Sequence, residues 1–341
     1  MLYGKRIVVV MLRMKASLLA TLLALTLVAC DTGKPVASSV GTGGSMPPAP
    51  LPTVSLAANP TSVVSGGSST LTWSSTDATS CLASGAWSGS KALSNSQSTG
   101  PLTISSTASS STFALTCTGS GGTTSASAMV TMTPRSYTTT FPLTENPISE
   151  GGNWINGGTD GLDGTDVSTT PGLAIGHQVG ASFTDATALL TGTWGPDQMA
   201  TATVHTVNQN DACFQEVELR LRSTISAHVN TGYEISFHMS QTSQAYLIIV
   251  RGNGAVGNFT VLLDTRGTQF GIKDGDIVSA KMVGNVITAF KNGVQMGRVT
   301  DNTFATGNPG MGFNLENAPA GCAGTNGDYG FTNYTATDGA S

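Results

Sequence analysis

The stretch IVSAKMVGNVITAFKNGVQMGRV, residues 277–299, decides the fold. Two dipeptides, Gly284-Asn285 and Asn292-Gly293, interrupt runs that are rich in β-branched residues. Two-residue Gly-Asn and Asn-Gly loops between such runs are typical of tight hairpins. The sequence therefore predicts a three-stranded antiparallel meander, whose strands cover Ile277–Val283, Val286–Lys291 and Val294–Val299.

The same alternation continues on both sides of this meander. Between residues 233 and 239, large apolar side chains alternate with Glu234, Ser236 and His238, which is the period of a strand with one buried face. Further β-rich runs cover 199–207, 214–222, 245–251, 258–264, 311–316 and 329–335. About ten antiparallel strands or more in one domain predict a two-sheet jelly roll over residues 137–341.

Composition narrows the class of protein. Of 341 residues only 10% are charged and 6% aromatic, while 42 are glycine, so long amphipathic helices are not expected. Four of the 15 basic residues precede Cys30, which leaves 11 basic against 20 acidic residues after it. Because a nucleic-acid partner needs clustered Lys and Arg, we expect no nucleic-acid binding.

The N-terminus is an export signal. Residues 16–29 are apolar and uncharged but too short to span a bilayer, and basic residues precede them, so residues 1–29 are predicted to be a signal peptide. The stretch Leu27-Val28-Ala29-Cys30 resembles the lipobox of bacterial lipoproteins, which implies a lipid on Cys30 and attachment to a membrane of the bacterial cell envelope. Residues 30–52 form a flexible tether rich in Pro, Gly and Ser. Inner or outer membrane, and a start at Met1 or Met14, stay open.

Residues 53–134 are predicted to form a separate small β-sandwich. Leu71 and Trp73 alternate with threonine and serine, and Phe113, Leu115 and Cys117 do the same. Runs of Gly and Ser separate these segments, as expected of short strands joined by turns. The prediction is therefore an all-β chain, in which a small sandwich precedes the jelly roll.

The cysteines support this division. Four remain after Cys30, and an exported chain meets an oxidising compartment, so disulfides are expected. A change in composition near residue 135 separates the four into two pairs. We predict Cys81–Cys117 and Cys213–Cys322, each within one domain.

Both domains resemble known families. The first resembles bacterial immunoglobulin-like modules at Leu71–Ser75 (LTWSS), Gly85–Gly89 (GAWSG) and Leu115–Cys117 (LTC). The second resembles the concanavalin A-like lectin/glucanase superfamily, with its laminin G-like domains, at Glu145–Trp154 (ENPISEGGNW), Lys273–Asp276 (KDGD), Lys291–Val294 (KNGV) and Gly307–Phe313 (GNPGMGF). The resemblances imply a spacer followed by a curved sandwich whose concave sheet often holds carbohydrate.

One predicted strand carries the catalytic candidates. In residues 214–222, Glu216, Glu218, Arg220 and Arg222 fall on one face. Two carboxylates so placed suit a retaining glycosidase, and Glu216 with Glu218 is the candidate pair. However, the glucanases of the superfamily carry a third acid on this strand where Arg220 stands. A ladder of opposite charges on a solvated sheet face is the alternative that needs no function.

Other residues are candidates for ligand or metal. Trp154, Trp194 and Tyr246 are aromatic platforms for a sugar, and Arg251 with Asn253 follows a strand in a plausible rim loop. Asp160, Asp163 and Asp166 recur in a glycine-rich loop, where carboxylates suit calcium but also ordinary turns. No cofactor is required by any motif in the sequence.

These observations favour noncatalytic carbohydrate binding at the cell envelope, with the immunoglobulin-like module as a spacer. The alternatives are a glycoside hydrolase or polysaccharide lyase that uses Glu216 and Glu218, and a module for protein–protein adhesion or envelope structure. Whether the chain is an enzyme, which glycan it binds and its oligomeric state stay open.

Overall fold

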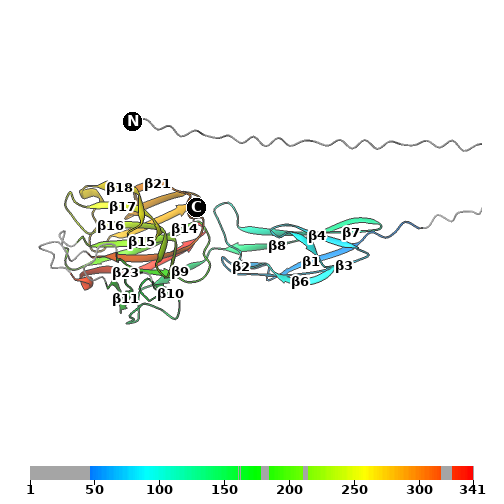
Figure 1. Cartoon of the computed structure of the whole chain (residues 1–341), viewed down its shortest axis with the longest axis horizontal. Helices are drawn as coiled ribbons and strands as arrows, with labels where there is room; N and C mark the ends of the chain where they lie inside the picture. The colour runs from blue at the N-terminus through cyan, green and yellow to red at the C-terminus, as the bar shows by residue number, and fades with distance from the viewer. Residues whose placement is uncertain are drawn as a thin grey trace, which may run out of the picture. The chain divides into compact units, whose positions relative to one another are not determined.

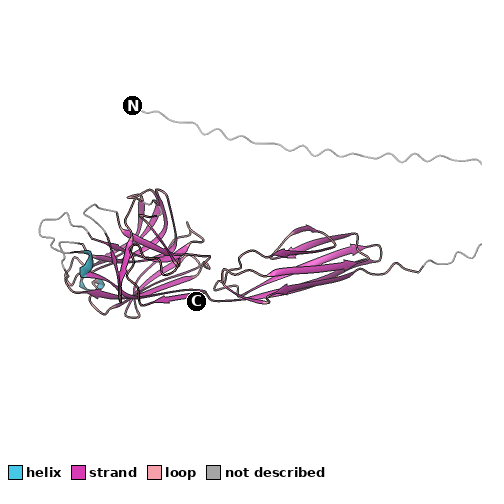
Figure 2. Ribbon diagram, turned by 90° about the horizontal axis from the view of Figure 1, so that it is seen from below, coloured by secondary structure: helices cyan, strands magenta, loops and turns pink. Residues whose placement is uncertain are grey.

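The computed structural model describes residues 47–159, 161, 163–177, 184–209, 214–315 and 325–340 (Figure 1). Nearly all regular structure in this part of the chain is β-strand (Figure 2), and its helical segments are two short 3-10 turns, η2 (Thr268–Phe270) and η3 (Asn326–Asp328). None of the described helical segments is long and apolar enough to cross a membrane. The predicted signal peptide and Cys30 lie outside the described residues, so export and lipid anchoring stay predictions.

Strands β1 to β8 form two sheets, blue to cyan-green in Figure 1. One sheet has the order β1-β3-β6, and the other has the order β2-β8-β7-β4-β5. The strands are β1 (Thr53–Asn59), β2 (Ser62–Val64), β3 (Thr70–Thr76), β4 (Ser80–Gly85), β5 (Gly89–Lys91), β6 (Ser94–Ser98), β7 (Ser110–Gly119) and β8 (Gly122–Thr133).

The predicted alternation builds the core of this small sandwich. Leu71 and Trp73 on β3 are buried, as are Phe113 and Leu115 on β7, while their sequence neighbours are more exposed. The predicted disulfide Cys81–Cys117 is confirmed. It joins β4 to β7, which are adjacent in the same sheet, with the two cysteines directly opposite each other. The likeness to immunoglobulin-like modules stays a prediction.

Strands β9 to β23 form two larger sheets. The seven-stranded sheet has the order β10-β13-β22-β15-β16-β17-β18, and the eight-stranded sheet has the order β11-β12-β23-β14-β19-β20-β21, with β9 also paired to β23. The strands are β9 (Ser136–Thr139), β10 (Trp154–Asn156), β11 (Val167–Thr170), β12 (Leu173–Gly176), β13 (Ala186–Leu190), β14 (Gln198–Thr206), β15 (Glu216–Ser226), β16 (Val229–His238), β17 (Tyr246–Gly254), β18 (Phe259–Arg266), β19 (Ile277–Val283), β20 (Val286–Lys291), β21 (Val294–Thr300), β22 (Asn308–Asn314) and β23 (Tyr329–Asp338).

The meander expected from the two-residue loops is confirmed as β19, β20 and β21, paired in antiparallel order. Each strand of the seven-stranded sheet alternates between the core and the opposite face. Val217, Leu219 and Leu221 on β15 are fully buried in one hydrophobic cluster with residues of the eight-stranded sheet, including Ala280 and Ile287. A fully buried side chain of this kind contributes about 1.5–3 kcal/mol. The predicted fold class, all-β with a small sandwich before a larger two-sheet one, is confirmed.

Candidate functional site

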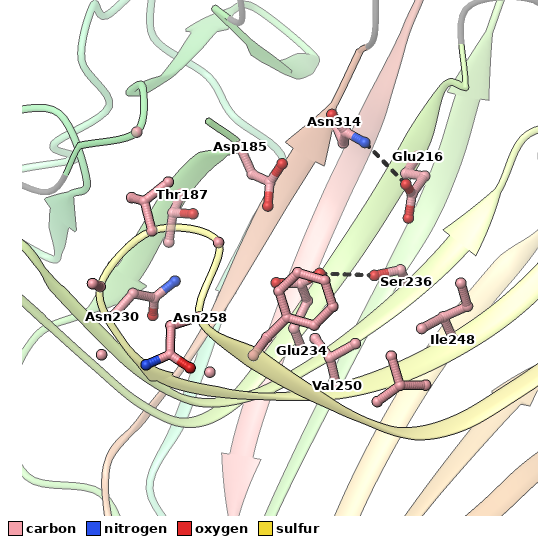
Figure 3. Close-up of a pocket in the computed structure, with 18 of the residues that line it drawn as sticks. Asp185, Thr187, Glu216, Asn230, Glu234, Ser236, Ile248, Val250, Asn258 and Asn314 are labelled. Atoms are coloured by element: carbon pink, nitrogen blue, oxygen red, sulfur yellow. Dashed lines mark hydrogen bonds between the residues drawn. The ribbon is translucent and has the colours of Figure 1, made fainter. Parts of the chain in front are cut away.

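The face of the seven-stranded sheet that points away from the core carries a cavity of about 350 Å³. Its apolar part comes from β17 and β18, where Ile248, Val250 and Val261 line it. Its polar part is formed by Asp185, Glu216, Glu234, Asp264, Arg266 and Asn314. Figure 3 shows Glu216 and Asn314 at one end of the hollow, with Asn230 and Asn258 at the other.

Strand register assembles the polar part. Glu218 on β15 lies opposite Ser236 on β16 and Gly312 on β22, and Arg220 lies opposite Glu234 on β16. Side chains that face each other across neighbouring strands are close enough to interact. Gly312 makes this packing possible, because a Cβ at that position would overlap the carboxylate of Glu218.

Arg220 lies at the centre of a buried ion cluster. Its guanidinium contacts the carboxylate of Glu218, lies 2.8 Å from an oxygen of Glu234 and 3.7 Å from an oxygen of Asp185. The side chains of Arg220 and Glu218 are only 3% and 1% exposed. Burial alone would lower the pKa of Arg220, but the charges of Glu234, Glu218 and Asp185 raise it, so the guanidinium stays charged.

The same three carboxylates are the candidate metal cluster of the described residues. One oxygen each from Asp185, Glu218 and Glu234 lies within 4.8 Å of the others, a spacing that suits a divalent cation. However, the Arg220 guanidinium contacts all three carboxylates. A metal would have to displace this guanidinium, so the residues do not fit a resident ion.

Glu216 forms part of the cavity wall. Asn314 donates a hydrogen bond from Nδ2 to Oε1 of Glu216 at 3.0 Å (Figure 3). Burial raises the pKa of Glu216 to about 7, and the charge of Glu234 adds to this, while hydrogen bonds from Asn314 and Tyr246 oppose it. At neutral pH both the acid and the carboxylate of Glu216 are therefore populated, so this group can give or accept a proton.

Glu218 behaves differently, although it lies only two residues away. Burial raises its pKa well above the ordinary value, with a further contribution from Glu234, while Arg220 acts in the opposite direction. Its side chain is 1% exposed and contacts Arg220. Glu218 is thus a buried part of the ion cluster, and Glu216 is the member of the candidate pair that faces the cavity.

A stack of planar groups lies next to Glu216, to which Tyr246 donates a hydrogen bond. The ring centroid of His238 lies 4.3 Å from that of Tyr246 at an interplanar angle of 19°, and the ring of Phe214 also stacks with that of His238, at 6.1 Å. The guanidinium of Arg266 covers the Tyr246 ring at 5.2 Å and also donates two hydrogen bonds to Asp264, at 3.1 and 3.0 Å. Arg266 is therefore fixed in orientation and paired in charge.

The expected charge ladder differs from the observed strand in two ways. The charges are buried rather than solvated, because Glu218 packs over Gly312 and contacts Arg220, and both side chains are almost completely covered. In addition, Arg222 does not share the face of Arg220. Its backbone has a positive φ of 46° at an irregularity in the strand pairing. Its guanidinium donates to the carbonyl oxygens of Pro196 and Gly284, away from the cavity.

The aromatic and rim candidates lie apart from the cavity lining. Trp154 and Trp194 are buried at 4% and 3% exposure, and their indole N–H groups donate to Tyr137 and Thr191. Arg251 forms an ion pair with Asp301 at 2.7 Å and donates a hydrogen bond to Asn253 at 3.0 Å. Of the five aromatic and rim candidates, only Tyr246 comes close to the cavity, because it forms a hydrogen bond with Glu216.

The aspartates of the predicted calcium loop point to separate partners. Asp163 accepts from His228 at 2.7 Å, and both carboxylate oxygens of Asp166 accept hydrogen bonds from Thr159. Asp160 lies outside the described residues, as do Cys213 and Cys322 of the second predicted disulfide. The calcium site and this disulfide stay predictions.

Several residues of the site were not anticipated from the sequence. Asp185 precedes β13, Glu234 lies on β16, Asp264 and Arg266 end β18, and Asn314 ends β22. No motif links them, because they come from different parts of the sequence, apart from Asp264 and Arg266 on β18, and only the strand register brings them together. The one signal in the sequence for any of these residues was the alternation of apolar and polar side chains over residues 233–239, which placed Glu234 on the polar face of its strand.

No protein-family model matches the chain, and no curated protein matches its sequence. Among solved structures, the chain is similar to the carbohydrate-binding module CBM66 from Bacillus subtilis, with 12% identity, a TM-score of 0.36, and coverage of 55% of this chain and 92% of the module. It is also similar to porphyranase B from Zobellia galactanivorans, with 11% identity, a TM-score of 0.40, and coverage of 60% and 93%. A third similar structure is the galectin LEC-6 of Caenorhabditis elegans, with 10% identity, a TM-score of 0.28, and coverage of 42% and 83%.

Proposed function

We propose that the cleft of the seven-stranded sheet binds a glycan. The observation that carries this proposal is one cavity of about 350 Å³ that combines carboxylate and amide groups with an apolar wall formed by Ile248, Val250 and Val261. A sugar ring presents hydroxyl groups at its edge and C–H groups on its faces. A lining of this mixed kind, within the usual size range of ligand sites, fits such a molecule.

The remainder of the chain acts as a carrier in this proposal. Residues 137–341 form the glycan-binding domain, and residues 53–134 form a spacer. Cys30 carries the lipid that holds the protein at the bacterial cell envelope. The lipobox resemblance at 27–30 and the flexible composition of 30–52 support this arrangement.

Hydrolysis of the bound glycan is the second candidate function, and the state of Glu216 favours it. A carboxyl group whose pKa is about 7 at a cavity wall is suited to donate a proton to a leaving oxygen. The partner carboxylate would be Glu234 or Asp185, which also line the cavity, and not the buried Glu218. A lyase acting on uronates is disfavoured, because the surrounding carboxylates would repel the acidic sugar.

Binding and hydrolysis are tested on the same protein. The soluble chain from residue 31 onward is applied to a glycan array, and reducing-sugar release is measured for every glycan that binds. Glu216→Gln removes a charge from the wall and is expected to weaken binding about tenfold. Asp274→Asn is the matched control, because it removes a carboxylate that is 62% exposed and outside the cavity lining.

The outcomes separate the hypotheses. Binding without sugar release supports recognition alone. Sugar release that disappears in Glu216→Gln and persists in Asp274→Asn supports hydrolysis. No binding to any glycan contradicts the proposal and favours the adhesion or structural module.

A further inference from the structure

The charges around the cleft are unbalanced. Four acids line the cavity, namely Asp185, Glu216, Glu234 and Asp264, whereas its lining contains one basic side chain, Arg266. Arg266 is already paired with Asp264 through two hydrogen bonds. The second cation of the site, Arg220, is 3% exposed beneath the surface and is shared by three carboxylates. The exposed wall therefore has a surplus of negative charge.

Asn314 gives an independent indication of the ligand. This side chain lines the cavity but is only 9% exposed. Its Nδ2 donates to Glu216, whereas its Oδ1 is buried and finds no hydrogen-bond partner among the described residues. A buried acceptor without a donor costs free energy, so a ligand that brings a donor to this end of the cleft is favoured.

The groups at this end therefore share one property. The carboxylates of Asp185, Glu216 and Glu234 and the carbonyl oxygen of Asn314 are hydrogen-bond acceptors when Glu216 is ionised. A sugar hydroxyl both donates and accepts, whereas an ammonium group has three donors, no acceptor and a positive charge. Of the groups that glycans carry, the ammonium matches this wall in both hydrogen bonding and charge.

We propose that the cleft recognises a glycan that bears protonated amino groups, as in polymers of de-N-acetylated hexosamine. This inference rests on the proposed glycan binding and names its substrate class. The ammonium group is held between Asp185, Glu216 and Asn314, and the ring lies against the apolar wall formed by Ile248 and Val250. An N-acetylated sugar replaces the charge with a neutral amide and loses the attraction.

The test compares two ligands that differ only in this group. Binding of glucosamine oligosaccharides and of N-acetylglucosamine oligosaccharides of equal length is measured by calorimetry, at a pH at which the free amine is protonated. We expect the deacetylated ligand to bind roughly tenfold more tightly at low ionic strength, with the ratio falling as salt is added. Asp185→Asn is expected to reduce the ratio severalfold, whereas Asp274→Asn leaves it unchanged.

Because Asp185→Asn also touches the Arg220 cluster, its folding is checked by thermal unfolding, and the salt dependence of the native protein is an independent measurement. Equal binding of the two ligands, or tighter binding of the N-acetylated one, overturns the inference but leaves glycan binding intact. If the protein binds only neutral or acidic glycans on the array, the preference for amino groups is likewise overturned, while glycan binding itself stands. Absence of binding to every glycan overturns both proposals.

Discussion

Replacing Arg220 by methionine tests the structural account of the site most directly. In the native protein the guanidinium is 3% exposed and contacts the carboxylates of Glu218, Glu234 and Asp185. Methionine keeps an unbranched apolar chain but removes the charge. Glu218, at 1% exposure, is then a buried acid without a nearby cation. Removal of one partner from a buried ion pair costs about 3–5 kcal/mol, and we expect Arg220→Met to lower the free energy of unfolding by about this amount at neutral pH.

The loss has a defined pH dependence. Burial and the charge of Glu234 raise the pKa of Glu218 in the folded protein, and removal of Arg220 takes away the main opposing contribution. A carboxyl group with a raised folded pKa favours the folded state while it is protonated, and this contribution is lost as the pH rises through the folded pKa. The cost of Arg220→Met is therefore smaller at a pH below the folded pKa of Glu218 than at a pH above it.

Urea unfolding at both pH values measures the cost, and a second substitution isolates its cause. Glu218→Gln combined with Arg220→Met removes the buried charge together with its partner, so the double variant is expected to recover most of the loss. Arg298→Met, at an exposed arginine outside the cleft, serves as the matched control and is expected to change stability by less than about 0.5 kcal/mol. The reasoning is refuted if Arg220→Met costs under about 1 kcal/mol at neutral pH, or if the cost is independent of pH.

Three further predictions concern single positions. The disulfide Cys81–Cys117 closes a separation of 36 residues, so replacing both cysteines by serine is expected to lower stability by about 4 kcal/mol, as calorimetry of the chain would measure; a change near zero would contradict this. Gly312→Ala places a Cβ against the carboxylate of Glu218 and is expected to cost about 1–3 kcal/mol in urea unfolding, while an unchanged midpoint would show that the packing is looser. Burial raises the pKa of Glu216 from 4.5 to about 7, so the contribution of this group to the free energy of unfolding is complete below pH 4.5 and is lost as the pH rises through 7. Glu216→Gln should therefore become more stable relative to the native protein as the pH rises. If the stabilities of the two proteins change in parallel with pH, the raised pKa is contradicted.

Local signals made the strands of the larger sandwich predictable. The dipeptides Gly284-Asn285 and Asn292-Gly293 select tight hairpins, because glycine and asparagine tolerate the positive φ that such turns need, and the structure has φ values of 51° and 58° at Asn292 and Gly284. Strand boundaries in this meander follow directly from the turn positions. The pairing Cys81–Cys117 was equally accessible, since the compartment and the domain division left few alternatives.

The site was much less predictable, because it depends on register between strands that are distant in sequence. Glu218 and Gly312 are neighbours in space but come from β15 and β22, and Glu234 reaches Arg220 from β16. Period-two alternation assigns each residue to a face but does not say which residue of another strand lies opposite. The aromatic candidates were ambiguous as well, because the sequence alone does not distinguish a tryptophan in a core from one that packs against a sugar. In the structure, Trp154 and Trp194 are buried.

The burial of charge in this cleft is itself an argument that the site has a function. Only 10% of the residues are charged, and 20 are acidic, yet Asp185, Glu218 and Glu234 gather around the guanidinium of Arg220, and Glu216 lines the same cavity. A solvated ladder on the sheet face would cost nothing, whereas this arrangement raises the pKa of Glu216 and Glu218 and opposes folding at neutral pH. Apolar residues of similar volume would stabilise the same sheet equally well or better. Departures from local stability rules of this kind are expected at functional sites, and a bound cationic group would relieve the surplus charge.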